Sequence, residues 1–227
     1  AISTKTPAWI DFTIYPNQVT GWTAANNTLT NATGIEAIAV VNPFYKIDRN
    51  GGFVQWKYTH TGEGQETTYA GLIETAAEVN VVAALATPFD PSISCLSVKY
   101  ASRAESTDTF IIQEYGVDKS LPITYAATDF IYMRFYRTND VGPEKNTFVV
   151  EVWTGGTGTL INNKLIYSSG ISLQNNYSPQ PFFYDDGQGG AIGSVFSAVR
   201  YIPEGEQTAQ QNSSLGSKAS EQNTFSL

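Results

Sequence analysis

The stretch "NGGFVQWKYTH" (50–60) begins with a turn-forming Asn-Gly-Gly and then alternates apolar and polar residues. Val54, Trp56 and Tyr58 fall on one side of an extended chain, and the polar residues between them fall on the other. This pattern predicts a half-buried antiparallel strand whose three apolar residues form a wall of the core. The only histidine, His60, ends the run, and its role is left open.

Similar runs recur along the chain between turn-rich segments, at the spacing expected of a sandwich of roughly eleven or twelve strands. Besides 50–60, the expected strands are 9–15, 35–45, 67–74, 95–101, 108–116, 129–137, 146–154, 164–170, 181–186 and 193–203. The polar, glycine-bearing "TGEGQE" (61–66) predicts a hairpin between its two flanking strands.

Two segments depart from this rhythm. The alanine-rich "ETAAEVNVVAALA" (74–86) could form a short helix, but its β-branched valines favour a strand or irregular structure. Residues 204–227 change abruptly to Gln, Ser, Asn and Glu and have almost nothing to bury. We therefore expect a β-sandwich domain over 1–203 and a polar C-terminal arm or tail over 204–227.

Composition excludes several partners. The chain has 227 residues, a formal net charge of -8 and 13 scattered Lys and Arg residues. A generic nucleic-acid-binding face needs clustered positive charge, so we expect no nucleic-acid partner. No apolar run is long enough to cross a bilayer, so we expect no membrane insertion. The lone cysteine, Cys95, has no disulfide partner in the chain and is expected in the core.

The order of features in the second half resembles a known family. "YAATDFIYMRFYR" (125–137) is a strand entered through an Asp, and "NTFVVEVWTGGTGTLINNKLIYSS" (146–169) is a strand, glycine loop and strand. "NNYSPQPFFYDDGQGGAIGSVFSAVRYIP" (175–203) adds an aromatic-Asp-Gly segment and a last strand. This order resembles the concanavalin A-like jelly roll and its SPRY-like relatives, over residues 9–203.

The resemblance implies an all-β fold, a two-sheet antiparallel β-sandwich. Such sandwiches occur in lectins, glycan-binding modules, some glycosidases and lyases, and many phage tail and capsid surface proteins. The fold does not choose among these functions, so the choice depends on the residues.

Glycoside hydrolysis usually needs two carboxylates flanking one bond. The nearest candidate pairs are Glu63 with Glu66, in a polar loop, and Glu74 with Glu78, at helical spacing. Solvated surface charge explains both pairs better than catalysis does.

A lyase site would need His60 and Tyr58 to converge with Arg134 or Arg137. A histidine at a strand end is more often a packing residue. No Ser or Cys nucleophile is credible, because His60 is the only candidate base and no Gly-x-Ser-x-Gly elbow is present. We therefore expect that the protein is not an enzyme.

Metal binding has one candidate. Asp185 and Asp186 precede "GQGG" and supply paired carboxylates, which suit calcium. An ordinary Asp-Gly turn is the better explanation. We therefore expect no cofactor and keep calcium as an alternative.

Aromatic residues make up 13% of the chain. Sugars bind proteins by laying their C–H faces on aromatic rings, while carboxylates and amides bind the hydroxyls. The candidate glycan-binding residues lie in loops or at strand ends and are Trp22, Trp153, Tyr177, Tyr184 and Asp185. For each of them core packing is an alternative, so only their convergence would define a site.

Three functions remain open. The first, which we favour, is a non-enzymatic virion surface protein such as a capsid decoration, fibre or tail component. Its partners would be neighbouring copies or other virion proteins, reached through the C-terminal arm, and host surface glycans. It would be assembled in the host cytoplasm and placed on the virion surface, with secretion as the alternative location. The second function is a stand-alone carbohydrate-binding module, and the third is a polysaccharide lyase or glycoside hydrolase.

Overall fold

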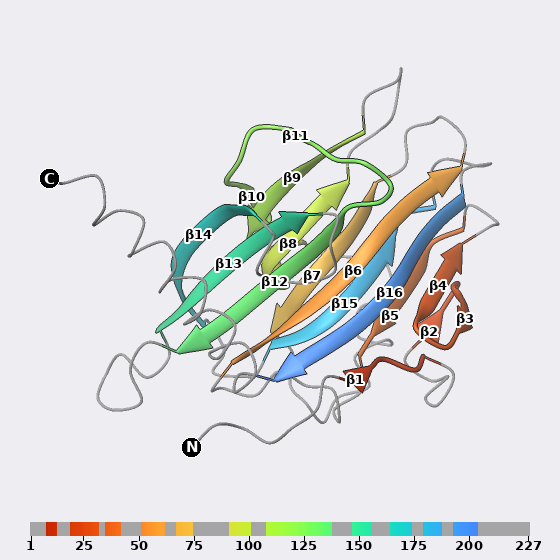
Figure 1. Ribbon diagram of the computed structural model, residues 1–227, viewed down its shortest axis with the longest axis horizontal. Coiled ribbons are helices and arrows are strands. Elements are labelled where there is room, and N and C mark those ends of the chain that lie inside the picture. Colours follow the sequence, from red (N-terminus) through yellow and green to blue (C-terminus); the bar gives the residue numbers. More distant parts are fainter. Residues whose placement is uncertain are drawn as a thin grey trace, which may run out of the picture.

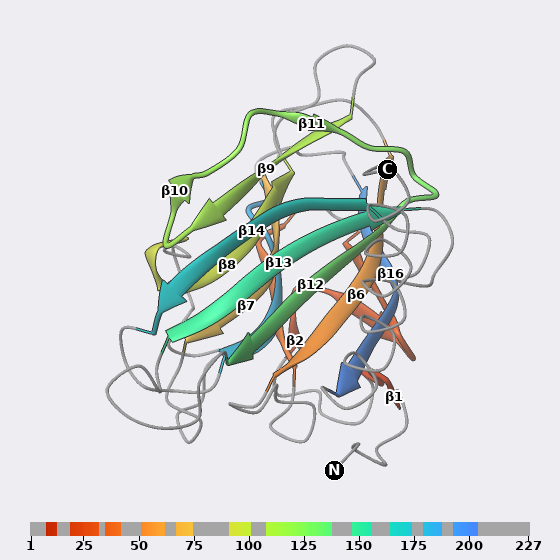
Figure 2. The same cartoon turned by 60° about the vertical axis from the view of Figure 1, so that its left-hand side comes forward.

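A computed structural model describes most of the chain. The described residues are 8–12, 19–31, 35–41, 51–61, 67–74, 91–100, 108–137, 147–155, 164–173, 179–187 and 193–203. They form two antiparallel sheets packed face to face, and the two layers can be followed in Figures 1 and 2. Within this part of the chain, no helix is both long and apolar enough to span a membrane.

Sheet A contains the strand of the opening stretch, β6, near its centre. Its strands, in spatial order, are β14 (Lys164–Ser172), β13 (Thr147–Gly155), β12 (Phe130–Arg137), β6 (Gly52–Thr61), β16 (Gly193–Pro203), β4 (Thr28–Asn31) and β3 (Thr23–Ala25). A short strand, β1 (Ala8–Trp9), pairs with β16.

Sheet B lies behind sheet A in the view of Figure 1. Its strands, in spatial order, are β10 (Val117–Asp118), β9 (Thr109–Glu114), β8 (Ser94–Tyr100), β7 (Thr68–Glu74), β15 (Pro179–Asp185), β5 (Ala37–Val40) and β2 (Val19–Thr20). A short strand, β11 (Ile123–Thr124), pairs with β9, and the short 3-10 helix η3 (Pro91–Ile93) leads into β8.

The core lies between the two sheets and confirms the reading of the opening stretch. Val54, Trp56 and Tyr58 are all buried in the main hydrophobic cluster. Trp56 donates a hydrogen bond from Nε1 to the hydroxyl of Tyr100 on sheet B, over 2.8 Å. The rings of Tyr58 and Tyr100 stack with their centroids 4.0 Å apart. Cys95 is also buried in this cluster, as predicted.

The prediction of an all-β two-sheet sandwich is therefore confirmed, but one predicted connection is wrong. The strands before and after "TGEGQE" do not form a hairpin, because β6 belongs to sheet A and β7 to sheet B. Their pairing partners differ entirely: β6 pairs with β12 and β16, and β7 pairs with β8 and β15. Alternating patterns identify strands but do not say which strands pair.

Two tight hairpins occur, and the second interrupts the expected strand 108–116. β3 and β4 are joined by Asn26 and Asn27, and β9 and β10 by Tyr115 and Gly116. Asn26 and Tyr115 have φ angles of 49° and 48°. A left-handed backbone conformation at the first loop residue gives a two-residue hairpin the twist of its flanking strands. Asn adopts this conformation readily.

Several predictions fall partly or wholly outside the described residues. In the segment 9–15, strand β1 ends at Trp9, while Ile10 and Phe12 are buried in the core. Of the segment 74–86, only Glu74 is described. The C-terminal arm, 204–227, is not described, so the domain boundary at 203 stays a prediction.

Candidate functional site

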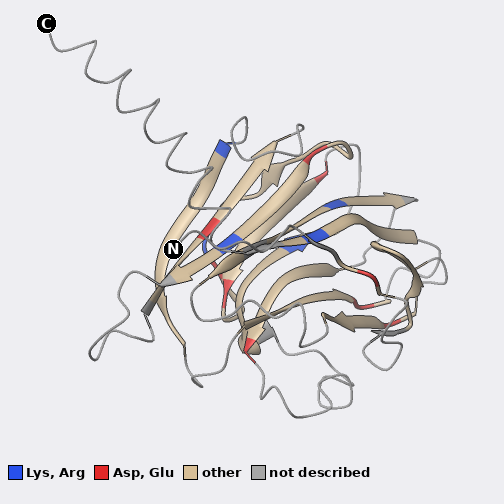
Figure 3. Cartoon of the chain, turned by 60° about the horizontal axis from the view of Figure 1, so that its bottom comes forward, with Lys and Arg blue, Asp and Glu red and all other residues tan. Residues whose placement is uncertain are grey.

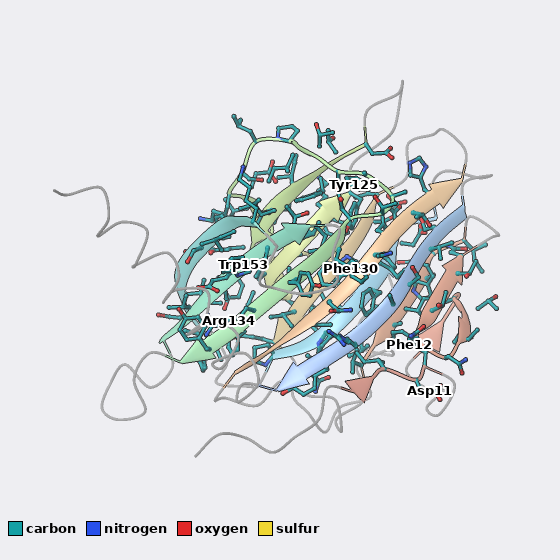
Figure 4. The ribbon with its side chains drawn as sticks, in the orientation of Figure 1. Asp11, Phe12, Tyr125, Phe130, Arg134 and Trp153 are labelled. Carbon is teal, nitrogen blue, oxygen red and sulfur yellow. The ribbon has the colours of Figure 1, made fainter. Side chains whose placement is uncertain are left out.

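The outer side of sheet A carries an aromatic cluster. On β12, Ile131, Met133 and Phe135 belong to the main core, so the residues between them face outward. The same alternation on β13 turns Glu151 and Trp153 outward. We define the aromatic face as the outward residues Lys57, Phe130, Tyr132, Arg134, Tyr136, Glu151 and Trp153. Figure 4 shows Phe130, Arg134 and Trp153 along β12 and β13.

Glu151 binds three of these side chains. Its Oε2 accepts hydrogen bonds from Arg134 Nη1 at 3.1 Å and from Trp153 Nε1 at 3.0 Å. Its Oε1 accepts one from the hydroxyl of Tyr136 at 3.3 Å. Because Glu151 and Arg134 are both buried, this ion pair is stronger than an exposed one and orients the rings around it.

Tyr136 is held from two sides. The guanidinium carbon of Arg134 lies 3.7 Å from the centroid of its ring, a cation–π contact. Burial raises the pKa of Tyr136 above its ordinary value, and the negative charge of Glu151 raises it further. The hydroxyl therefore stays protonated at neutral pH and remains a donor to Glu151.

Three of the rings are partly open to solvent. Phe130, Tyr136 and Trp153 are half-buried, whereas Tyr132 beneath them is 1% exposed. Tyr132 stacks on Phe130 with a centroid distance of 6.0 Å and packs against Trp153. The outer face of a sandwich sheet is normally polar, whereas this cluster lies outside the core between the sheets. Partly exposed rings fixed from below are suited to contact a flat apolar ligand surface.

Gln55 adds a buried polar group beside the rings. It lies opposite Tyr132 in the pairing of β6 with β12 and is 1% exposed. Its Nε2 donates to the carbonyl of Ala198 at 3.4 Å, and its Oε1 has no hydrogen-bond partner among the described residues. A buried acceptor without a partner is costly, so this atom suits a buried water molecule.

The structure distributes the residues predicted to bind glycans over different sides of the sandwich. Among the candidates that the structure describes, Trp153 alone lies on the aromatic face. Trp22 is buried, donates from Nε1 to the carbonyl of Phe183 at 3.3 Å, and packs in the core against Phe196. Tyr177 lies outside the described residues.

Tyr184 and Asp185 belong to sheet B. Tyr184 is buried in a second cluster on the outer side of that sheet, and its hydroxyl donates to Glu36 at 2.8 Å. Asp185 is fully buried, and its Oδ1 accepts a hydrogen bond from Gly187 N at 3.0 Å. Among the described residues, the predicted candidates do not converge on one site, so a glycan contact at each of them stays a prediction.

Asp185 also belongs to the candidate calcium site. Asp185 Oδ2 is buried and has no hydrogen-bond partner among the described residues, so it could supply one ligand oxygen. Calcium needs six to eight oxygens in typical sites. The part of the chain that the structure describes contains no group of three or more His, Cys, Asp or Glu side chains able to hold a metal. These residues therefore do not provide the donor set of a calcium site.

His60 lies at the end of the core and not on the aromatic face. Its Nε2 is 2.8 Å from Asp108 Oδ1, and its ring stacks near Tyr58. Arg134 lies on the opposite, outer side of sheet A and is bound to Glu151. Sheet A therefore separates Arg134 from His60 and Tyr58, and the Arg137 side chain lies outside the described residues.

Sequence reasoning missed most of the aromatic face. The run "DFIYMRFYR" (129–137), an expected strand, has apolar or aromatic residues at almost every position, so its alternation does not say which side faces the core. One feature of the sequence does indicate an aromatic outer face: both sides of this strand carry aromatic rings. A half-buried strand needs only one apolar side.

Comparisons with known proteins agree with the fold. No protein-family model matches the sequence, and no curated protein matches it significantly. Solved structures do match. The carbohydrate recognition domain of Emp46p has a TM-score of 0.52 at 7% identity, covering 85% of this chain and 91% of that one. The exoplasmic/lumenal domain of VIP36, in its Ca2+/Man2-bound form, has a TM-score of 0.51 at 7% identity, covering 81% of this chain and 79% of that one.

A legume lectin-like domain from Entamoeba histolytica is also similar, with a TM-score of 0.47 at 12% identity, covering 82% of this chain and 88% of that one. Identities this low show the fold alone. The chain has the legume lectin-like, concanavalin A-like jelly-roll fold.

Proposed function

We propose that this protein is a non-enzymatic glycan-binding protein whose ligand lies on the aromatic face of sheet A. The observation that carries the proposal is the set of half-buried rings of Phe130, Tyr136 and Trp153 on the outside of a lectin-like sandwich. Two of the similar structures are described as a carbohydrate recognition domain and as a mannose-bound form, which supports the same class of ligand.

The chemistry of the face favours binding over bond cleavage. Trp153 is fixed by its hydrogen bond to Glu151, so little side-chain entropy is lost when a sugar packs on its ring. Glycoside hydrolysis would require a second carboxylate across the bond, and Glu151 is the only acid on the strands of sheet A.

Trp153→Ala tests the proposal. Isothermal titration with the best glycan from an array should show a loss of at least about fivefold in affinity, because stacking on an indole contributes roughly 1 kcal/mol or more. Leu121→Ala is the control, since Leu121 is exposed and lies beside the sheet B edge. Unchanged glycan affinity in Trp153→Ala, with the fold intact, would remove the aromatic face from the proposal.

The role of a virion surface protein stays a prediction of the sequence. No observation on the described residues favours assembly through 204–227, or a virion or secreted location, over a stand-alone module. The mass of the purified protein in solution separates the two. A monomer that binds glycan tightly would count against the assembly role, and a stable oligomer without glycan affinity would count against the module.

A further inference from the structure

Charge is divided between the two sheets. The strands of sheet A carry Lys57, Arg134, Arg137, Lys164 and Arg200 against the single acid Glu151. The strands of sheet B carry the opposite balance, namely the acids Glu74, Glu114, Asp118 and Asp185 against the single base Lys99. Figure 3 marks these bases in blue and acids in red. In a chain with a net charge of -8, a mainly basic sheet is contrary to the overall composition.

One of these bases lies beside the exposed rings. Lys57 lies opposite Phe130 in the pairing of β6 with β12, and its Nζ is 4.4 Å from the centroid of the Phe130 ring. Lys57 is half-buried and forms no ion pair within the described part of the chain. Arg134, by contrast, is buried and neutralised by Glu151. Lys57 is therefore the cation of the aromatic face that remains able to bind an anion.

We infer that the ligand of the aromatic face is an acidic saccharide, whose carboxylate or sulfate group binds Lys57 Nζ while its sugar ring packs on Phe130 and Trp153. This inference rests on the proposed function and specifies the ligand class for the same site. The ammonium group already lies over a ring, so one sugar residue can contact the cation and the aromatic surface together.

The remaining charges restrict the partner further. Strand-borne acids on sheet B, such as Glu114 and Asp118, would repel an anionic chain, so binding is confined to sheet A. A nucleic acid would need many phosphate contacts, and the aromatic face offers a single uncompensated cation.

Titration calorimetry at low salt tests the inference with three probes: an oligogalacturonate, a sulfated galactan oligosaccharide and a neutral galactan oligosaccharide. We expect at least one acidic probe to bind about tenfold more tightly than the neutral one, with affinity falling as salt rises. The better acidic probe identifies the anionic group as carboxylate or sulfate.

Lys57→Gln should weaken binding of that acidic probe about fivefold and so reduce its advantage over the neutral probe, because one charge-assisted contact is removed. Lys57→Arg should keep the preference. Lys99→Gln, a loss of one positive charge from sheet B, is the matched control and should change nothing.

The inference would be overturned by equal affinity for acidic and neutral probes, by no effect of Lys57→Gln, or by an equal effect of Lys99→Gln. A change in self-association instead of glycan affinity in Lys57→Gln would also overturn it, in favour of a second copy as the partner. A different result would contradict the proposed function itself: Trp153→Ala would then leave the binding of every probe unchanged.

Discussion

At the scale of single residues, Glu151 organises the aromatic face. One carboxylate accepts hydrogen bonds from Arg134, Tyr136 and Trp153, which come from two adjacent strands. The sequence indicates that Glu151 and Trp153 share one side of a strand, because they are two positions apart. It could not indicate that Arg134 lies opposite Glu151, since that depends on the register of β12 with β13.

Glu151→Ala should lower the free energy of unfolding by about 3 kcal/mol. The substitution leaves the buried Arg134 without its counter-charge and removes the acceptor shared by Tyr136 and Trp153. Urea unfolding followed by tryptophan fluorescence measures the change. The double variant Arg134→Leu/Glu151→Leu should recover much of the loss, because no charge then remains buried at this position. A double variant no more stable than Glu151→Ala would contradict this account of the pair.

At the scale of elements, the close approach of β7 to β8 depends on Gly71. A Cβ atom at Gly71 would lie 2.2 Å from the carbonyl oxygen of Leu96 and 2.7 Å from the Cα atom of Ser97. Both obstacles are backbone atoms of the paired strand and cannot move aside as a side chain would. From sequence, a glycine inside a strand indicates that another backbone comes close to it. Only the strand pairing shows which backbone atoms these are.

Gly71→Ala should therefore destabilise the protein by about 2 kcal/mol or more, because the two strands must separate. Gly170→Ala is the matched control. The nearest atom to a Cβ there is the carbonyl oxygen of Phe148 at 4.0 Å, so the change should be neutral or slightly stabilising. Thermal unfolding of the two variants against the parent chain measures the difference. Equal melting temperatures would show that β7 and β8 adjust without cost.

At the scale of the whole molecule, polar contacts tie the two sheets together. Beyond the bond of Trp56 to Tyr100, the hydroxyl of Tyr58 lies 3.2 Å from both Thr68 on sheet B and Ser194 on sheet A. At one edge of the sandwich, the hydroxyl of Tyr167 on β14 donates to Glu114 on β9 at 2.8 Å. These contacts join residues distant in sequence, so no local pattern predicts them.

Stability should fall at high pH through buried tyrosines, and the pKa values of Tyr167 and Tyr69 are raised the most. Burial raises the pKa of Tyr167 to about 12, and its hydrogen bond to Glu114 adds to the effect. Burial also raises the pKa of Tyr69 to about 12, with further contributions from Asp186 and Asp118. The folded state holds these protons more tightly than the unfolded state, whose tyrosines titrate near pH 10. The stabilisation is therefore complete below pH 10 and lost as the pH rises through 12.

Urea midpoints measured from pH 8 to pH 12 check this prediction. Tyr167→Phe should show a smaller decline between pH 10 and pH 12 than the parent chain, because one of the two phenols no longer ionises. A parent chain with a flat midpoint across this window would contradict the expected linkage.

The sequence by itself determined the fold class, the main strands and the buried wall of Val54, Trp56 and Tyr58. It could do so because alternation with a period of two is a local property that a half-buried strand must have. Only the tertiary structure decided that β6 and β7 part into different sheets, and that Lys57, Phe130, Glu151 and Trp153 share one outer surface. The physical reason is that strand pairing and register set which distant side chains meet, and these depend on contacts between segments.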